Sequence, residues 1–164
     1  GLAIASISPK AEARFEQVGN RGYYLDLKHL VKYVDKKDHQ YPSTPSLSHM
    51  FALDFQLDRI FLEGLENRFT RHLEMAEFMV DWSNKYFKQF AQPGFESMTV
   101  TCIDNTRNIN VGDLNKELAK RNMQISNGYG DLKDKTFRIA HMGELMMADM
   151  VEVTGAIEEI LKLK

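Results

Sequence analysis

The stretch that decides the fold is Ser126–Gly130 (SNGYG), followed closely by Lys135–Gly143 (KTFRIAHMG). The two glycines predict a loop, and the side chains after Lys135 alternate as they do in a half-buried strand. In such a strand Phe137 and Ile139 would face a core, whereas Arg138 would face the other way, beside small neighbours. The stretch therefore predicts a glycine loop and then a strand that presents one arginine on its second face.

Arg138 is the strongest candidate for a binding residue. Its guanidinium group is planar and always charged, so it could hold a carboxylate by two parallel hydrogen bonds. Most arginines on strands only lie on a solvated face, and the residues alone leave that alternative open.

The second half of the chain mixes strands and helices. Residues 98–102 predict a strand whose apolar members, Cys102 among them, face inward, and residues 123–126 predict another. Asn110 is an N-cap residue that should open a helix. A terminal helix is predicted by an apolar stripe, which consists of Met147, Met150, Thr154, Ile157 and Leu161.

The first half is predicted to be mostly helical. The apolar run of residues 2–7 predicts a buried strand, and Ser8-Pro9 suits the start of a helix. A short helix is expected over residues 27–35. Thr44-Pro45 should open a long helix over residues 45–63 that Gly64 ends. A further amphipathic helix should run to Gln92-Pro93-Gly94, with Phe69, Leu73, Ala76, Val80, Phe87 and Phe90 as its apolar stripe.

These elements predict an α+β fold. A small, mostly antiparallel sheet of about three strands would be covered by helices, with the N-terminal strand and the long helix linking it to a larger preceding body. We expect residues 1–44 to form an arm and connector, and residues 45–164 to form one C-terminal domain. An N-terminal strand taken from a larger sheet would lack its neighbours here.

Composition excludes several classes of function. The chain has 164 residues, with 21 basic and 23 acidic side chains and a formal charge of -2, so a nucleic-acid partner is not expected. No apolar run approaches the roughly 20 residues that span a bilayer, and no signal segment is visible, so no membrane partner is expected either. The single cysteine, Cys102, fits a reducing compartment, and we expect a cytoplasmic protein.

Tyr41 and Thr44 form a second candidate site. Thr44-Pro45 is predicted at a helix N-terminus, where free backbone N–H groups and the helix dipole favour an anion such as a phosphate. On spacing alone, the pattern favours the alternative in which Thr44 is a simple helix cap and Tyr41 a surface residue.

The histidines and the cysteine do not suggest chemistry of their own. The five histidines have no mutual spacing typical of a metal site, so we predict no metal. His141, in the predicted strand, is expected to be structural. Cys102 is expected to be a small core residue and not a nucleophile.

Three blocks of the sequence, in this order and spacing, resemble the C-terminal part of class V pyridoxal-phosphate aminotransferases, in the alanine–glyoxylate and serine–pyruvate branch. They are Tyr23–Asp26 (YYLD), Tyr41–Pro45 (YPSTP) with Glu63–Arg68 (EGLENR), and the stretch from Ser126 to Gly143. One departure is Ala140, where the family's Arg-Ile-Gly-His-Met-Gly has glycine, and this methyl affects only fine packing.

The resemblance implies a fragment of a transaminase that moves an amino group between a small amino acid and a 2-oxo acid, such as alanine or serine with glyoxylate or pyruvate. The lysine that binds the cofactor would lie shortly before Gly1, so this chain would carry no catalytic residue and would be inactive alone, without bound cofactor. Tyr41 and Thr44 would contact the cofactor phosphate of the other subunit of a homodimer. Arg138 would bind the substrate α-carboxylate. The alternative is a non-catalytic α+β interaction or ligand-sensing domain.

Overall fold

The computed structural model describes residues 2–36, 38 and 40–164. Its contacts fall into two compact units, Gly1–Leu62 and Glu63–Lys164, which we call the N-terminal and the C-terminal unit. The prediction that residues 1–44 form an arm and connector and residues 45–164 a C-terminal domain refers to the domains of a larger enzyme, and it stays a prediction. No helix of the described residues is long and apolar enough to cross a membrane.

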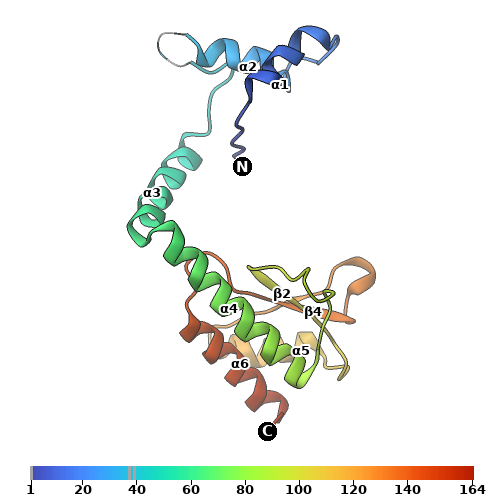
Figure 1. Ribbon diagram of the computed structural model, residues 1–164. Coiled ribbons are helices and arrows are strands. Elements are labelled where there is room, and N and C mark those ends of the chain that lie inside the picture. Colours follow the sequence, from blue (N-terminus) through green and yellow to red (C-terminus); the bar gives the residue numbers. More distant parts are fainter. Residues whose placement is uncertain (1, 37, 39) are drawn as a thin grey trace. The chain divides into compact units, whose positions relative to one another are not determined.

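The N-terminal unit consists of short helices and a long one (Figure 1). Helix α1 is Pro9–Arg14, a 3-10 turn follows at Phe15–Gln17, α2 is Leu27–Val34, and α3 is Leu47–Glu63. The predicted cap of α1 is present, since the Ser8 hydroxyl accepts a hydrogen bond from the Ala11 N–H at 3.2 Å. Asp26 caps α2, which was not predicted. None of these helices has a buried residue, so this unit lacks a core of its own.

Two sequence predictions about this unit are wrong. Residues 2–7 form no strand, and Ile4 is 76% exposed. A strand needs a neighbour that satisfies its backbone groups, and the described residues provide none beside this segment. Thr44 is not the cap of α3, because that helix starts at Leu47 and the N-cap position therefore falls near Ser46.

The C-terminal unit is the predicted α+β body. It contains α4 (Leu65–Tyr86), β1 (Lys88–Gln89), β2 (Val100–Asp104), α5 (Val111–Ala119), β3 (Ser126–Asn127), a 3-10 turn (Gly130–Leu132), β4 (Thr136–Ala140) and α6 (Met147–Leu161). The strands form one antiparallel sheet in the order β1-β2-β4-β3. Asn110 caps α5 as expected, since its side-chain oxygen accepts from the Asp113 N–H at 3.1 Å.

One face of this sheet is covered by α4, α5 and α6 (Figure 1). The core between them includes Met75, Met79, Leu118, Phe137 and Ile157, all at 0% exposure. The second face of the sheet is only half-buried at Val100, Cys102 and Arg138. An antiparallel sheet with one covered and one open face can present a polar side chain without interrupting its core.

The prediction of which side chains of β2 face the core was wrong. Thr101 and Ile103 are buried, whereas Cys102 is half-buried on the second face. The buried threonine is tolerated because its hydroxyl lies 2.9 Å from the ring Nε2 of buried His141.

The end of α4 also differs from the prediction, because the helix stops at Tyr86 and not near residue 90. Phe87 leaves the helical conformation, and its ring packs edge-on against Phe137 with centroids 5.1 Å apart. The residues that follow form β1, which pairs with β2 and was not predicted. A two-residue edge strand has too few side chains to show a period in the sequence.

Candidate functional site

Arg138 lies in the middle of β4 on the half-buried face of the sheet. In the strand register it stands opposite Cys102 of β2 and Ser126 of β3. Side chains that face each other across an antiparallel pair lie on the same face. Two small side chains therefore flank the arginine on both neighbouring strands and leave room around its guanidinium group.

The guanidinium group is held by two contacts. Nη2 of Arg138 donates a hydrogen bond to the Asn127 carbonyl at 3.1 Å, and its Cζ lies 4.0 Å from the centroid of the Tyr129 ring. A second donor atom of the group, Nε, is buried and has no hydrogen-bond partner among the described residues. Since a buried charged donor without a partner is costly, this N–H marks a place where an anion would be stabilised.

The loop before β4 is closed by backbone hydrogen bonds. The Gly128 N–H donates to the Thr136 carbonyl at 2.9 Å, and the Asn127 side-chain oxygen accepts from the Asp134 N–H at 2.9 Å. Gly128 is buried, and a Cβ atom there would lie 2.1 Å from the Leu132 carbonyl oxygen. Only glycine fits this position, so the first glycine of the loop is a packing requirement.

A second pair of arginines fixes the turn that follows β4. Arg68 and Arg71 of α4 donate to the Gly143 carbonyl at 3.0 and 3.1 Å, and Arg71 also donates to the Leu145 carbonyl. Glu63 pairs with both arginines at 2.7 Å. Hydrogen bonds from Arg71, and then from Arg68, lower the pKa of Glu63 from its ordinary value of 4.5 to about 2.

No role for this arginine pair was predicted from the sequence. Glu63 and Arg68 belong to one of the quoted blocks, but the carbonyl groups that the arginines bind lie more than 70 residues further along the chain. Only a local signal was present, namely two arginines three residues apart on one face of a helix.

His141 is structural, as the sequence predicted. It is fully buried, and burial lowers its pKa below the ordinary value. Its Nε2 contacts the Thr101 hydroxyl, and its Nδ1 has no partner among the described residues.

Tyr41 and Thr44 lie in the segment between α2 and α3 of the N-terminal unit. Both are exposed, and both line an open hollow of about 840 Å³. Within the part of the chain that the structure describes, no hydrogen bond uses either side-chain hydroxyl. Two hydroxyl groups three residues apart are therefore free to bind a ligand of the hollow.

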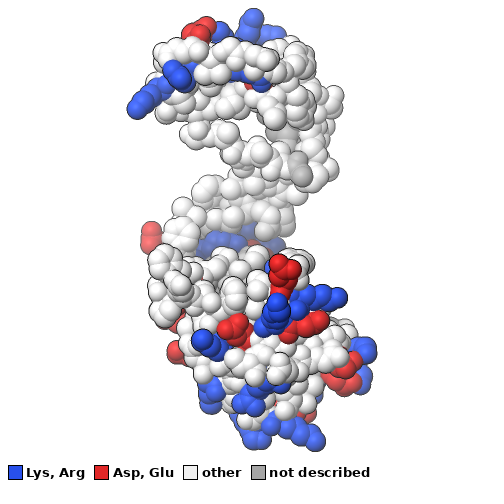
Figure 2. All heavy atoms as spheres, turned by 90° about the vertical axis from the view of Figure 1, so that its right-hand side faces the viewer, with Lys and Arg blue, Asp and Glu red and all other residues white. Residues whose placement is uncertain are grey.

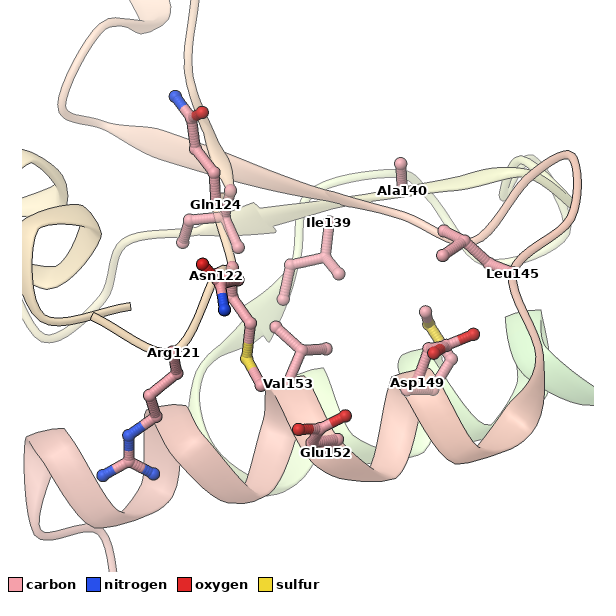
Figure 3. A pocket seen from close by; sticks show the side chains of 12 residues that line it. Arg121, Asn122, Gln124, Ile139, Ala140, Leu145, Asp149, Glu152 and Val153 are labelled. Atoms are coloured by element: carbon pink, nitrogen blue, oxygen red, sulfur yellow. The ribbon is translucent and has the colours of Figure 1, made fainter. Parts of the chain in front are cut away.

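A smaller hollow of about 460 Å³ lies on the helix-covered side of the sheet in the C-terminal unit. Figure 3 shows Ile139 of β4 and Val153 of α6 pointing toward each other across it. Arg121 at its edge is already paired with Glu159 at 2.8 Å. Several of its lining residues, among them Gln124, Asp149 and Glu152, are exposed, so it is an open surface hollow, and we assign no ligand to it.

Charge and metal-binding groups give no further candidate. On the face of the molecule in Figure 2, basic and acidic side chains are interspersed over the C-terminal unit. Among the described residues, no group of three or more His, Cys, Asp or Glu side chains could hold a metal ion.

No protein-family model matches the chain. The chain is 32% identical to an uncharacterised aminotransferase of Methanocaldococcus jannaschii, over 99% of this chain and 43% of that protein. It is 28% identical both to the soluble hydrogenase small subunit of Synechococcus sp. (98% and 42%) and to serine–glyoxylate aminotransferase of Arabidopsis thaliana (99% and 41%). The chain thus spans about two fifths of the length of these relatives.

Solved structures agree on the fold. An alanine–glyoxylate aminotransferase from Nostoc sp. superposes with a TM-score of 0.78 at 21% identity, covering 94% of this chain and 42% of that one. A phosphoserine aminotransferase from Cytophaga hutchinsonii gives 0.80 at 20% identity, covering 92% and 41%.

Proposed function

Since the chain is homologous to the C-terminal part of class V aminotransferases, we propose that it forms the substrate-carboxylate site of a pyridoxal-phosphate-dependent transaminase. The reaction would move an amino group between a small amino acid and a 2-oxo acid. The observation that carries this proposal is the buried Nε of Arg138, which has no partner among the described residues.

Arg138 suits a carboxylate better than other anions. Its Nε and Nη2 lie on one edge of the planar guanidinium group, and such an edge matches the two oxygens of a carboxylate. Nη2 has two N–H groups, so its bond to the Asn127 carbonyl leaves one available. The flanking Cys102 and Ser126 are small enough to admit the substrate. Held by its carboxylate, an amino acid would have its Cα–H in one fixed orientation.

The cofactor would supply the electron sink for the reaction. The hydroxyl groups of Tyr41 and Thr44 fit its phosphate as hydrogen-bond donors, since neither has a partner among the described residues. The hollow that they line has no lysine or arginine among its described lining residues, so these groups alone cannot neutralise a phosphate. This supports a site completed by other parts of a homodimer.

The lysine that would hold the cofactor and transfer the proton is not assigned to this chain. None of the chain's lysines stands in a context that resembles the cofactor lysine of the family. We therefore propose that the active protein, here called the full-length enzyme, joins this chain to a region that carries the lysine. We place it in the cytoplasm.

Activity of the full-length enzyme tests the proposal. The enzyme would be supplied with pyridoxal phosphate and given alanine, serine or aspartate, each with glyoxylate or pyruvate, and the new amino acid would be quantified by chromatography. Transfer to at least one pair is expected. Isopropylamine, in which a methyl group replaces the carboxylate of alanine, is the matched control and should react far more slowly. Absence of transfer with every pair, or equal rates with isopropylamine, would refute the proposal.

A further inference from the structure

An exposed tyrosine lies against the guanidinium group of the candidate site. The Tyr129 side chain is 76% exposed, so it is not part of a core. Its ring faces Arg138, with the guanidinium carbon 4.0 Å from the ring centroid. This distance is well within the range of about 6 Å in which an aromatic face attracts a cation.

The backbone on both sides of Tyr129 holds the ring in place. Before it, Gly128 is buried and bonded to Thr136. After it, the turn Gly130–Leu132 is closed by a hydrogen bond from the Leu132 N–H to the Tyr129 carbonyl at 3.0 Å. Gly130 adopts a positive φ of 52°, which a glycine allows without strain. The backbone that carries the ring is therefore fixed on both sides of Tyr129.

Contact with a ring face uses none of the in-plane N–H groups of an arginine. Nη2 is oriented by the Asn127 carbonyl, and the ring fixes the plane of the group, so Nε keeps its N–H for a ligand. With one in-plane bond and one face contact, the guanidinium group has little freedom to rotate. An arginine fixed in this way loses less entropy when it binds a carboxylate.

We infer that Tyr129 is a positioning residue, whose ring face orients the guanidinium group of Arg138 for the carboxylate of the substrate. The inference rests on the proposed function of Arg138. The ring face, and not the hydroxyl group, orients the guanidinium group. Phenylalanine at this position should therefore preserve the effect, whereas leucine, which is apolar but has no aromatic face, should abolish it.

Nuclear magnetic resonance of the full-length enzyme with ¹⁵N-labelled arginine gives a readout that needs no activity. The Nε–H resonance of Arg138 is identified by its loss in Arg138→Lys. A ring at this distance displaces that resonance, and Tyr129→Phe should keep the displacement while Tyr129→Leu removes it. Phe95→Leu, at a phenylalanine that is 80% exposed, is the matched control and should change nothing.

Titration with propionate, an unreactive carboxylate, then tests the positioning. Affinity read from the same resonance should be unchanged in Tyr129→Phe and about 2- to 30-fold weaker in Tyr129→Leu, with a parallel fall in kcat/KM for amino acids. Wild-type affinity and kcat/KM in Tyr129→Leu would overturn the inference while leaving the carboxylate site intact. A wild-type Arg138 resonance that ignores propionate would instead overturn the proposed function, and the inference with it.

Discussion

Arg138 differs from an ordinary surface arginine because its Nε is buried and has no partner in the described part of the chain, while Asn127 and Tyr129 contact the rest of the guanidinium group. The cause lies in the alternation of β4, which sends Phe137 and Ile139 into the core and leaves Arg138 on the other face. The proposed site needs both a positive charge and a planar edge of N–H groups. Lysine would keep the charge and lose the planar edge, so it should not replace Arg138.

Gly128→Ala should destabilise the loop that carries Tyr129. The added Cβ would lie 2.1 Å from the Leu132 carbonyl oxygen and 2.6 Å from the Thr136 hydroxyl oxygen, so backbone must move. Overpacking of this kind costs about 1–3 kcal/mol, which denaturant unfolding can measure.

Gly155→Ala is the matched control for that substitution. Gly155 lies inside α6, and a Cβ there would meet nothing within 4 Å. This variant should be more stable than the wild type by about 0.5–1 kcal/mol, because alanine favours a helix over glycine. Equal stability of the two variants would show that the loop is not constrained at Gly128.

Tyr41→Phe and Thr44→Val should each weaken cofactor retention in the full-length enzyme without changing the fold. Each removes one hydrogen bond to a charged group, worth about 1.5–3 kcal/mol, or about one to two decades in affinity. The enzyme would be dialysed at decreasing protein concentrations, and the absorbance of the cofactor that stays bound would measure its retention. Ser43→Ala, an exposed hydroxyl in the same segment, is the control. Retention equal to that of the control in both variants would leave Tyr41 and Thr44 without a role.

Among the elements, the junction of α3 and α4 has a role that extends to the turn after β4. Gly64 separates the two helices with a φ of 84°. Directly beside this break, Glu63 holds the two arginines that bind the carbonyls of Gly143 and Leu145. The turn that follows β4, the strand that contains Arg138, is thus anchored to α4.

Glu63→Gln should remove an acid-dependent part of the stability. The pKa of Glu63 falls from 4.5 to about 2 in the folded chain, so its contribution is present above pH 4.5 and is lost as the pH falls toward 2. Thermal unfolding between pH 6 and pH 3 should show a smaller decrease for the variant than for the wild type. Glu74→Gln, at an exposed carboxyl of α4, is the control, and a slope equal to this control would contradict the anchoring role.

The elements also show what sequence can and cannot predict here. The glycine loop, β4, the cap at Asn110 and the stripe of α6 were predicted, because each has a local signal in turn chemistry or periodicity. The prediction of which face of β2 points inward was wrong, because the hydroxyl group of buried Thr101 has a hydrogen-bond partner 40 residues away, His141. The short strand β1 and the contacts of Arg68 and Arg71 depend likewise on distant residues.

At the scale of the candidate site, the residues were predictable and their surroundings were not. Residue type and spacing made Arg138, Tyr41 and Thr44 candidates, and the resemblance to the aminotransferase family gave them their expected roles. The unpartnered Nε, the ring of Tyr129 and the free hydroxyl groups are properties of packing, and no local pattern encodes them. The roles of the three residues in binding stay predictions.

For the molecule as a whole, the C-terminal unit should be acid-sensitive through its core. Burial lowers the pKa of His141 below its ordinary value of 6.5, so the neutral ring favours folding above that pH and the stability falls as the pH decreases. His141→Gln can still bond to Thr101 and should show less loss of stability between pH 7 and pH 5. Denaturant unfolding measures this, with His49→Gln, at an exposed histidine, as control. An unchanged pH dependence would contradict the prediction.

Each of the two units of the chain presents its own candidate binding groups. The N-terminal unit has no buried helix residue, and its two candidate hydroxyl groups line a hollow without a described cation. The C-terminal unit has a hydrophobic core and, on its open face, the candidate carboxylate-binding residue Arg138. Under the proposed function, each unit would contribute contacts to an active site that other parts of the full-length enzyme complete.

The most direct test of the account is the kinetics of Arg138→Lys in the full-length enzyme. Lysine keeps the charge but loses the planar edge, and misplacement of a substrate by about 1 Å can cost about a hundredfold in rate. We predict a fall in kcat/KM of about that size, equal for every amino acid and 2-oxo acid, because all share the carboxylate, with unchanged cofactor retention. Near-normal kcat/KM in Arg138→Lys, or a loss confined to one substrate side chain, would contradict the assignment of Arg138 as the carboxylate-binding residue.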